Sequence, residues 1–397
     1  YMTINTNPED IQTLLSRGVE KIYPSAELLA KELATGRRLR IYAGFDPSGN
    51  SLHIGHAVQI NKLAQFQALG HEVIFLIGDF TGMIGDPTDK KATRKQLTRE
   101  EVLANASSYQ AQASSYLDFT GANKVETKYN SEWQDQLNFA DLIRLSANFT
   151  VGQMMVRDMF RVRVEEDKPI YLHEFLYPLA QAYDSVMLDV DVEVGGNDQM
   201  FNMMCGRDLM KVLKGKEKFV VTMKLLADEN GVKMGKTDGN AVFLNAEPKE
   251  MFGQIMSWPD SFIAPSFEIC TKRPLAEVLE IKEKLASGAN PMEYKLELAK
   301  ELVTTFHSAE AATEAREYFR ATVQERGIPT DIKEVSGATV LESAVNYFGS
   351  SKSKADIKRL VEQGAVSVND TKVTSFDTPV KAGDQVQMGK RDWFRIM

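Results

Sequence analysis

The sequence predicts an α/β fold with a Rossmann-like parallel sheet, followed by an α-helical domain and a small α+β domain. Its 397 residues exceed what a single hydrophobic core usually holds. A strand–helix–strand pattern lies within residues 39–77, and the character of the chain changes at about residue 274 and again after residue 337. Together these observations favour two or three domains.

Residues 39–77 form the predicted βαβ unit. Residues 39–45 read as a strand, residues 46–50 as a turn, and a helical pattern starts near Leu52 and stops at Gly70. Residues 73–77 are continuously apolar, which is typical of a strand buried on both faces. Parallel sheets bind ligands at the carboxyl ends of their strands, so residues 46–56 and 79–87 are expected at a binding site.

The later elements follow from the same periodicities. Residues 131–187 are largely helical and apolar, although Pro178 interrupts the pattern, and residues 218–222 are another strand candidate. Three amphipathic helices are expected within residues 274–327, followed by a linker over residues 328–337. The tail combines a short basic helix at residues 353–363, ended by Gly364, with alternating strand patterns within residues 366–388.

The composition excludes several classes of protein. No apolar run approaches the roughly 18 residues of a membrane helix, and the first residues lack the basic-then-apolar order of a secretory signal. Cys205 and Cys270 are the only cysteines, which argues against a disulfide scaffold or a cysteine zinc site. We therefore expect a cytoplasmic protein that does not contact a membrane.

The net charge of −8 is unevenly distributed. Residues 350–397 contain nine Lys/Arg and six Asp/Glu, a net charge of +3, so the rest of the chain carries −11. An acidic body with a basic tail indicates an anionic partner contacted by the tail, with a merely solvated surface as the alternative.

His53 and His56 flank Gly55 at the start of the first predicted helix. A helix N-terminus favours phosphate through its dipole and its free N–H groups, and imidazoles there can donate hydrogen bonds to phosphoryl oxygens. Gly55 would let a flat ligand group approach the backbone. Two ordinary surface histidines, or half of a metal site, are the alternatives.

Residues 231–237 resemble a phosphate-binding loop without matching it. The G-x-x-x-x-G-K-[ST] pattern requires glycine at position 230, which is Asn230. Lys233 and Lys236, followed by Thr237, instead suggest cations on a glycine-containing loop that closes on a polyphosphate. A solvated charged turn is the alternative.

Two further groups of residues are candidates for binding a small zwitterion. Thr81 and Asp86 lie in a glycine-containing loop after a strand, where Asp86 could hold an ammonium group, and the basic cluster with Lys90 and Arg94 follows. Tyr177, Gln181 and Asp184 are spaced by four and three residues, so they share one face of a helix. A loop with a basic rim and a half-exposed helix face are the corresponding alternatives.

Residues 194–199 place two glycines before Asp198 and Gln199. The glycines permit close approach of a ligand, and the carboxylate and amide suit hydrogen bonds to a ribose or an amide. A simple turn explains this stretch equally well unless the other motifs hold.

With these motifs in this order, the chain resembles the bacterial tyrosyl-tRNA synthetases, a family of class I aminoacyl-tRNA synthetases. The resemblance rests on residues 42–56, 78–90, 177–184, 195–199 and 233–237, and on an S4-like RNA-binding region at about residues 339–397 that residues 364–369 match best. It departs from the family at Gly235 and Thr237, where the wider class often has serines, and at Met200, where many relatives have tryptophan.

The resemblance implies a role for each candidate residue. Tyr42 and Asp184 would meet the phenol hydroxyl of tyrosine, while Asp86, Tyr177 and Gln181 would hold its ammonium group and Thr81 would line the pocket. The residues implied for the adenosine or tyrosyl group are Gly44, Asp46, Gly55, Gly196, Asp198 and Gln199. Those implied for the phosphates are Ser48, His53, His56, Lys90, Arg94, Lys233, Lys236 and Thr237. Residues 131–170 match weakly, and no pocket residue is taken from them.

The resemblance also implies an organisation and a set of partners. Residues 1–245 would be the catalytic domain with a helical insertion at about 131–187, residues 246–330 an anticodon-recognition domain, and residues 337–397 an S4-like domain. The partners would be L-tyrosine, ATP with Mg²⁺ as its substrate complex, tRNA(Tyr) and a second copy of the chain, with residues 131–187 at the interface. No metal ligands of the protein itself are expected. A tryptophan-specific relative and a non-catalytic RNA-binding protein with this fold are the alternatives.

Overall fold

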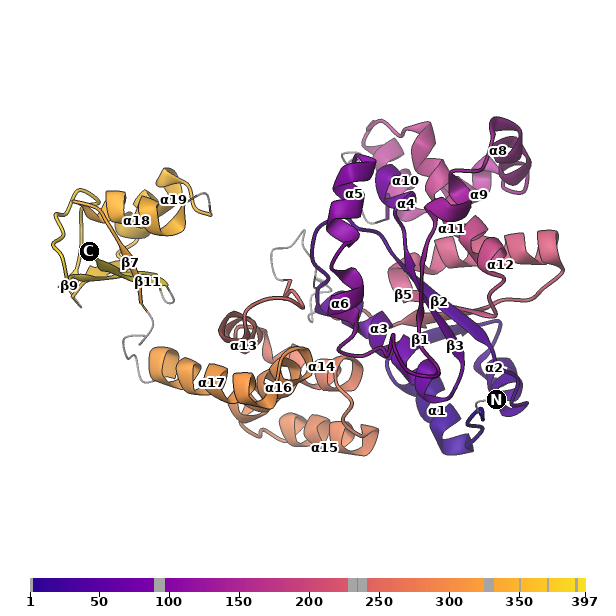
Figure 1. The fold of residues 1–397 in the computed structure, drawn as a ribbon, viewed down its shortest axis with the longest axis horizontal. Helices are drawn as coiled ribbons and strands as arrows, with labels where there is room; N and C mark the ends of the chain where they lie inside the picture. The colour runs from indigo at the N-terminus through magenta and orange to yellow at the C-terminus, as the bar shows by residue number, and fades with distance from the viewer. Residues whose placement is uncertain are drawn as a thin grey trace. The chain divides into compact units, whose positions relative to one another are not determined.

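The structure of the protein, a computed structural model, describes residues 3–88, 97–227, 234, 241–324, 332–349, 351–369, 371–389 and 392–397. It divides into two compact units, Tyr1–Ser308 and Ala309–Met397 (Figure 1). The predicted three-part division remains a proposal, because helices of the expected middle domain group with the first unit. No helix within the described ranges is long and apolar enough to cross a bilayer.

The first unit is built on a six-stranded sheet. Its order is β1 (Val19–Tyr23), β6 (Phe219–Met223), β5 (Val192–Gly196), β2 (Arg40–Phe45), β3 (Glu72–Ile77) and β4 (Glu126–Tyr129). Only the β1–β6 pair is antiparallel, so five neighbouring strands run in the same direction. Strands β2 and β3 agree with the predicted strands to within a residue, and α3 (Ile54–Ala68) joins them as predicted.

The direction in which the chain crosses the sheet reverses beside β2. From β2 the chain moves outward through β3 to β4, whereas β5 lies on the other side of β2 and leads to β6. Helix α3 packs on β2, β3 and β5, while α12 (Met200–Lys214) packs on β5 and β6. A crevice opens beyond the strands' carboxyl ends at such a switch point, where open α/β sheets bind ligands.

The remaining helices of the first unit surround this sheet. N-terminal to α3 are α1 (Pro8–Ser16) and α2 (Ala26–Ala34). Between β3 and β5 lie α4 (Thr81–Ile84), α5 (Arg99–Ala106), α6 (Tyr109–Ala113), α7 (Ser131–Gln134), α8 (Phe139–Ser146), α9 (Val151–Met155), α10 (Asp158–Glu165) and α11 (Leu172–Leu188). The helical segment predicted at 131–187 is confirmed, but Pro178 does not interrupt it, because α11 continues through this residue.

A helical group completes the first unit. It contains η3 (Asp260–Phe262) and the helices α13 (Pro248–Met256), α14 (Ile263–Cys270), α15 (Leu275–Ala286) and α16 (Pro291–Phe306). Helix α14 packs on α3, and the Arg17 guanidinium donates hydrogen bonds to four backbone carbonyls at and after the end of α14. These bonds satisfy carbonyls that a helix end leaves unpaired, and they tie this group to the sheet.

The second unit contains a small five-stranded sheet. Its order is β7 (Lys333–Val335), β11 (Asp392–Ile396), β10 (Gln385–Met388), β8 (Val366–Val368) and β9 (Thr371–Lys372). Helices α18 (Val340–Phe348) and α19 (Lys354–Glu362) belong to the same unit, with α17 (Ala309–Phe319) and the π-helical turn η4 (Arg320–Gln324) before them. Val340, Ile357, Val386 and Phe394 are fully buried members of its core.

The tail prediction is right about one helix and two strands and wrong about the linker. Helix α19 is capped by Ser353 and followed by Gly364 at a φ of 66°, as the pattern indicated. Residues 333–335 do not form a linker, because β7 pairs in parallel with β11 over these positions. Lys333 and Glu334 are charged, so β7 has no apolar pattern from which a strand could be predicted. Strand β11 was not predicted either.

Candidate active site

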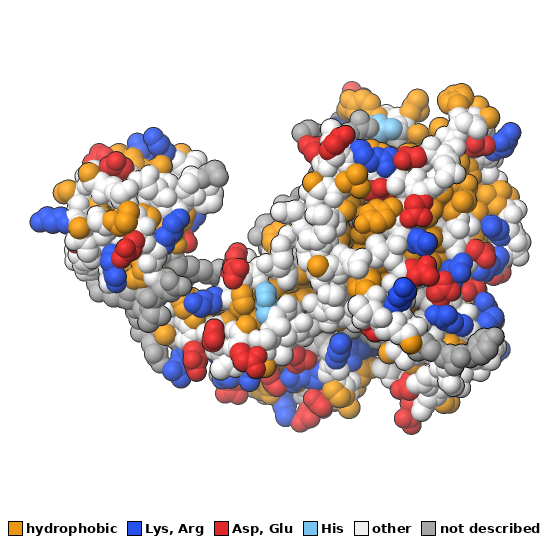
Figure 2. Space-filling view, in the orientation of Figure 1, with side chains coloured by type: hydrophobic (Ala, Val, Ile, Leu, Met, Phe, Trp, Pro, Cys, Tyr) orange, Lys and Arg blue, Asp and Glu red, His pale blue; other side chains and the backbone are white. Residues whose placement is uncertain are grey.

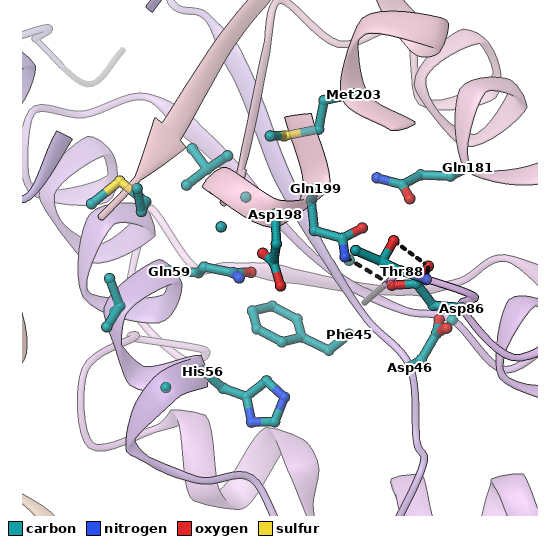
Figure 3. A pocket seen from close by; sticks show the side chains of 18 of the residues that line it. Phe45, Asp46, His56, Gln59, Asp86, Thr88, Gln181, Asp198, Gln199 and Met203 are labelled. Carbon is teal, nitrogen blue, oxygen red and sulfur yellow. Dashed lines mark hydrogen bonds between the residues drawn. The ribbon is translucent and has the colours of Figure 1, made fainter. Parts of the chain in front are cut away.

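One pocket lies at the carboxyl ends of β2 and β5 and takes in most of the predicted site residues (Figure 3). The predicted residues that line it are Tyr42, Gly44, Asp46, Ser48, His53, Gly55, His56, Thr81, Asp86, Tyr177, Gln181, Asp184, Gly196, Asp198 and Gln199. The predicted residues Lys90, Arg94, Lys233, Lys236 and Thr237 lie outside the described residues. Within the described ranges, no group of three or more His, Cys, Asp and Glu could hold a metal ion.

His53 caps the start of α3, and His56 lies in its first turn. His53 is the N-cap residue, and its Nδ1 accepts a hydrogen bond from the backbone N–H of Gly55 at 3.1 Å. Nδ1 of His56 accepts a hydrogen bond from the backbone N–H of His53 at 3.1 Å, and the centroids of the two imidazole rings are 3.9 Å apart. In a neutral ring whose Nδ1 accepts, the proton is on Nε2, so both Nε2 atoms are donors.

Gly55 is required by the packing of this cap. A Cβ at this position would lie 2.8 Å from Cε1 and 2.9 Å from Nδ1 of His53. Any larger residue would therefore displace the His53 ring, so the glycine keeps the imidazole over the first turn of α3.

Asp46 follows β2 and is held by two neighbouring side chains. Its Oδ2 accepts from the Tyr177 hydroxyl and its Oδ1 from the Thr81 hydroxyl, both at 2.7 Å. A Cβ at position 78 would lie 2.0 Å from Asp46 Oδ1, so only glycine fits beside this carboxylate. The loop after β3 and the face of α11 thereby meet at the end of β2.

Asp86 is held by Gln199 and by its own loop. Its Oδ2 accepts from Gln199 Nε2 at 2.8 Å, and its Oδ1 accepts from the backbone N–H and the hydroxyl of Thr88 (Figure 3). Thr88 in turn accepts from Arg157 at 2.7 Å. The carboxylate is therefore fixed by residues from three separate parts of the chain.

Asp184 is a buried carboxylate surrounded by donors. Its Oδ1 accepts from Trp133 Nε1 at 2.8 Å and from Gln134 Nε2 at 2.9 Å, and its Oδ2 accepts from Asn130 Nδ2 at 3.1 Å. Burial raises the pKa of Asp184 to about 7, although these three hydrogen bonds lower it. The carboxylate is thus held in place and is easily protonated near neutral pH.

Tyr42 lines the same pocket as Asp184, but its hydroxyl is bonded to another residue. It makes a 2.9 Å hydrogen bond with the Ser185 hydroxyl. Burial raises the pKa of Tyr42 well above its ordinary value, and the charges of Glu193 and Asp184 add to this effect, so the phenol remains neutral. Tyr42 and Asp184 both line the pocket without being hydrogen-bonded to each other.

Several residues of the site were not predicted from the sequence. Asn130, Trp133 and Gln134 hold Asp184, and they lie just before or at the start of the weakly matching residues 131–170. Glu193 lines the pocket and accepts from Gln181 Nε2 at 3.0 Å, and Lys218 pairs with Glu193. A glutamate within an otherwise apolar buried strand was the signal that could have found this pair.

Comparison with known proteins decides the family. The family model for class I tRNA synthetases (W and Y) matches residues 34–324, and the S4 domain model matches residues 347–386. The chain is 43% identical over 400 residues to a tyrosine–tRNA ligase of Carboxydothermus hydrogenoformans, with 97% of each chain covered. The chain belongs to the tyrosine–tRNA ligase family.

Other relatives of this ligase agree with the assignment. A tyrosine–tRNA ligase of Colwellia psychrerythraea is 44% identical over 390 residues, covering 96% of this chain and 97% of its own. A C-terminally truncated mitochondrial tyrosyl-tRNA synthetase of Aspergillus nidulans aligns with a TM-score of 0.65 at 25% identity, over 78% of this chain and 93% of that one. The Archaeoglobus fulgidus tyrosyl-tRNA synthetase, solved with L-tyrosine, shares the fold with a TM-score of 0.62 at 22% identity, over 78% of this chain and 100% of that one.

The ligase is therefore a class I aminoacyl-tRNA ligase. The predicted family, the parallel-sheet catalytic fold with its S4 domain, and the predicted enzyme class are confirmed.

Proposed function

We propose that the pocket joins L-tyrosine to ATP and then passes the tyrosyl group to the 3′ end of tRNA(Tyr). In the first step the tyrosine carboxylate attacks the α-phosphorus of ATP, an O–P bond forms, and the bond to pyrophosphate breaks. The nucleophile is already ionised, so no general base is needed, and catalysis consists of positioning and charge stabilisation. In the second step a terminal hydroxyl of the tRNA attacks the activated carbonyl and AMP leaves.

The observation that carries this proposal is the buried Asp184 carboxylate beside Tyr42. Asp184 is 2% exposed, and its three protein donors leave acceptor capacity on Oδ2 for one more hydrogen bond. A substrate phenol would supply that bond, whereas phenylalanine would leave the carboxylate unpaired. Sites built in this way reject the analogue that lacks the hydroxyl, as is known for tyrosyl-tRNA synthetases.

We assign the ammonium group of tyrosine to Asp86, Tyr177 and Gln181. Asp86 brings a negative charge to the pocket, and Tyr177 and Gln181 add oxygen acceptors from the face of α11 that carries Asp184. Gln199 supports this set by donating to Asp86. Thr81 lines the pocket between these groups and holds Asp46.

We assign the nucleotide to the start of α3 and the end of β5. His53 and His56, donating through Nε2, would stabilise charge on the phosphate oxygens together with Ser48 and the α3 N-terminus. Gly44, Gly55 and Gly196 line this part of the pocket. Asp46 and Asp198 offer acceptors to this part of the ligand, with Asp198 suited to the ribose hydroxyls. Lys90, Arg94, Lys233, Lys236 and Thr237 remain proposed phosphate contacts.

Magnesium enters this scheme as part of the ATP substrate. It would neutralise the pyrophosphate that leaves.

Pyrophosphate–ATP exchange with single amino acids tests this function. We expect exchange with tyrosine and not with phenylalanine or tryptophan. Exchange with tryptophan alone would favour the tryptophan-specific relative, which the phenol-type Asp184–Tyr42 end of the pocket argues against. Absence of exchange with every amino acid would favour a non-catalytic RNA-binding protein, for which the paired histidines would have no use.

We further propose that the second unit contributes to tRNA binding. Residues 347–386 match the S4 domain model, and Lys352, Lys354 and Lys358 lie within or just before α19. The net positive charge of residues 350–397 suits contact with the phosphate backbone of the tRNA. Residues 246–330 are proposed to recognise the anticodon. We also propose that the ligase is cytoplasmic, because the cytoplasm supplies tRNA and ATP.

We also propose that the ligase is a homodimer formed through its helical segment at residues 131–187. Phe139, Val151 and Leu172 are 78%, 77% and 84% exposed, and Val156 is 73% exposed. Figure 2 shows hydrophobic side chains gathered near α8 and α10. Large exposed apolar surfaces of this kind mark interfaces, and a second copy offers the matching surface under two-fold symmetry.

Sedimentation velocity tests the dimer. We expect the wild-type chain to sediment as a dimer and Leu172→Glu to shift it toward monomer. Val212→Glu is the matched control, because Val212 is also well exposed, at 65%, but lies on α12 outside this segment. A dimer that survives Leu172→Glu, or one that Val212→Glu breaks equally, would contradict the proposed interface.

A further inference from the structure

A buried ion pair lies directly behind the pocket and has no assigned role in the reaction. Glu193 is 2% exposed, Lys218 is completely buried, and Lys218 Nζ donates to Glu193 Oε2. Burial lowers the pKa of Lys218, while the adjoining Glu193 carboxylate opposes this shift. Two charges removed from water in this way are costly, and the pair remains only because its partners satisfy it.

The contacts of Glu193 reach a proposed substrate contact. Its Oε1 accepts from Gln181 Nε2 at 3.0 Å, and its Oε2 accepts from Lys218 and, at 3.3 Å, from the Ser185 hydroxyl. Lys218 also donates to Ser185 at 2.9 Å. Glu193 therefore lies between Lys218, whose ammonium group can only donate hydrogen bonds, and the amide of Gln181.

This arrangement determines which way the Gln181 amide faces. An ionised carboxylate only accepts hydrogen bonds, so the amide must turn its NH₂ group toward Glu193. Its oxygen, Oε1, is buried and has no hydrogen-bond partner among the described residues, although Gln181 lines the pocket. The end of the amide that has no protein partner is therefore an acceptor, which suits an ammonium group, and not a donor, which would repel it.

We propose that Glu193, paired with Lys218, is a positioning residue that fixes the Gln181 amide so that its oxygen receives the ammonium group of tyrosine. This inference rests on the proposed function, since it takes Gln181 as an ammonium contact. Glu193 acts through Gln181.

The substitution Glu193→Gln would reverse the amide. Lys218 can only donate, so the new side chain must turn its oxygen toward Lys218 and Ser185, which leaves its NH₂ group facing Gln181. Two NH₂ groups cannot bond to each other, so Gln181 must turn over and present its own NH₂ group to the ligand. The hydrogen bond between Ser185 and Tyr42 is preserved.

Three ligands separate this effect from a general disturbance of the pocket. L-Tyrosine and tyramine carry the ammonium group, whereas 3-(4-hydroxyphenyl)propionate has the same ring and no ammonium. For Glu193→Gln we expect the Kd of tyrosine and tyramine, measured by calorimetry, to rise by about tenfold to a hundredfold. The Kd of 3-(4-hydroxyphenyl)propionate should stay within about twofold.

Two further variants complete the test. Glu174→Gln is the matched control, because Glu174 pairs with Arg163 in an equally buried ion pair that does not line the pocket, and it should leave all three affinities unchanged. If Glu193→Gln does not fold, Glu193→Met/Lys218→Met removes both charges together. It frees the Gln181 amide, and the same selective loss for tyrosine and tyramine is expected.

Equal weakening of all three ligands, or no change in any, would overturn the positioning role. Failure of the proposed function would be visible earlier, because the wild-type protein would then not bind tyrosine more tightly than 3-(4-hydroxyphenyl)propionate.

Discussion

The substitution Asp184→Asn tests the origin of tyrosine specificity in the pocket. Oδ1 of Asp184 receives two donors, from Trp133 and Gln134, and Oδ2 receives one, from Asn130. The oxygen of the new asparagine will therefore keep the side with two donors. Its NH₂ group will occupy the Oδ2 position, facing Asn130 and the place of the substrate phenol.

The magnitude follows from the bonds that are lost. The phenol loses a hydrogen bond to a charged acceptor, worth about 1.5–3 kcal/mol, which corresponds to roughly a 10- to 150-fold rise in the Kd of tyrosine. Phenylalanine has no hydroxyl to lose, so discrimination between the two amino acids should fall by a similar factor. The KM for ATP should remain within about twofold, because no proposed nucleotide contact changes.

The pH dependence provides a second signature. Because burial raises the pKa of Asp184 from 3.8 to about 7, the folding stability that its neutral form supplies is fully present below about pH 3.8 and is lost as the pH rises through about 7. A tyrosine phenol prefers the ionised form. The wild-type Kd for tyrosine should therefore rise as the pH is lowered from about 8 to about 6, and the Asn variant should show a flat profile.

Calorimetric titration with tyrosine and phenylalanine at several pH values, combined with pyrophosphate exchange, measures all of these quantities. Equal losses of tyrosine and ATP affinity would refute the assignment of Asp184 to the phenol. If the Kd of the Asn variant for tyrosine varied with pH as the wild-type Kd does, the proposed role of Asp184 ionisation would be refuted.

Three further predictions address other parts of the protein. His56→Ala should lower kcat of pyrophosphate exchange by roughly 10²-fold with the KM for tyrosine unchanged, since a phosphate donor is lost; an unchanged kcat would exclude this role. Deleting Ala309–Met397 should preserve pyrophosphate exchange and weaken tRNA charging by at least about tenfold, whereas loss of exchange would show that the second unit supports the first. Burial lowers the pKa of Lys62 to about 7, so the stability linked to it is fully present above about pH 10.5 and is lost as the pH falls to about 7. Lys62→Met should therefore reduce the gain in unfolding free energy between about pH 7 and 9 by up to roughly 2 kcal/mol in denaturant titrations, and an unaltered gain would contradict the shift.

The central part of the fold was predictable because its pattern is local. Residues 73–77 of β3 are continuously apolar, β2 is mostly apolar, and the helix between them has a three- and four-residue period, so the bounds of all three follow from the sequence to within about two residues. Helix α3 begins two residues after the expected start near Leu52, because His53 serves as its cap. Strands β7 and β11 were missed because each is stabilised by pairing with the other across the small domain.

The site was predictable where its residues repeat along one element. Tyr177, Gln181 and Asp184 share a helix face, and the structure brings them into one pocket. Trp133 donates a hydrogen bond to Asp184, which is 51 residues away in the sequence, and a contact between such distant residues cannot be predicted from hydrophobic periodicity. Residues of this kind become visible only when the fold brings separate elements together.

A structure of the ligase with a non-hydrolysable tyrosyl-adenylate analogue tests the central claim most directly. Under the proposed function, we expect the phenol oxygen within hydrogen-bond distance of Asp184 and Tyr42, the ammonium group on Asp86 and the Gln181 oxygen, and the phosphate at the cap of α3. An analogue bound with its phenol away from Asp184, or with its phosphate away from the α3 cap, would contradict it.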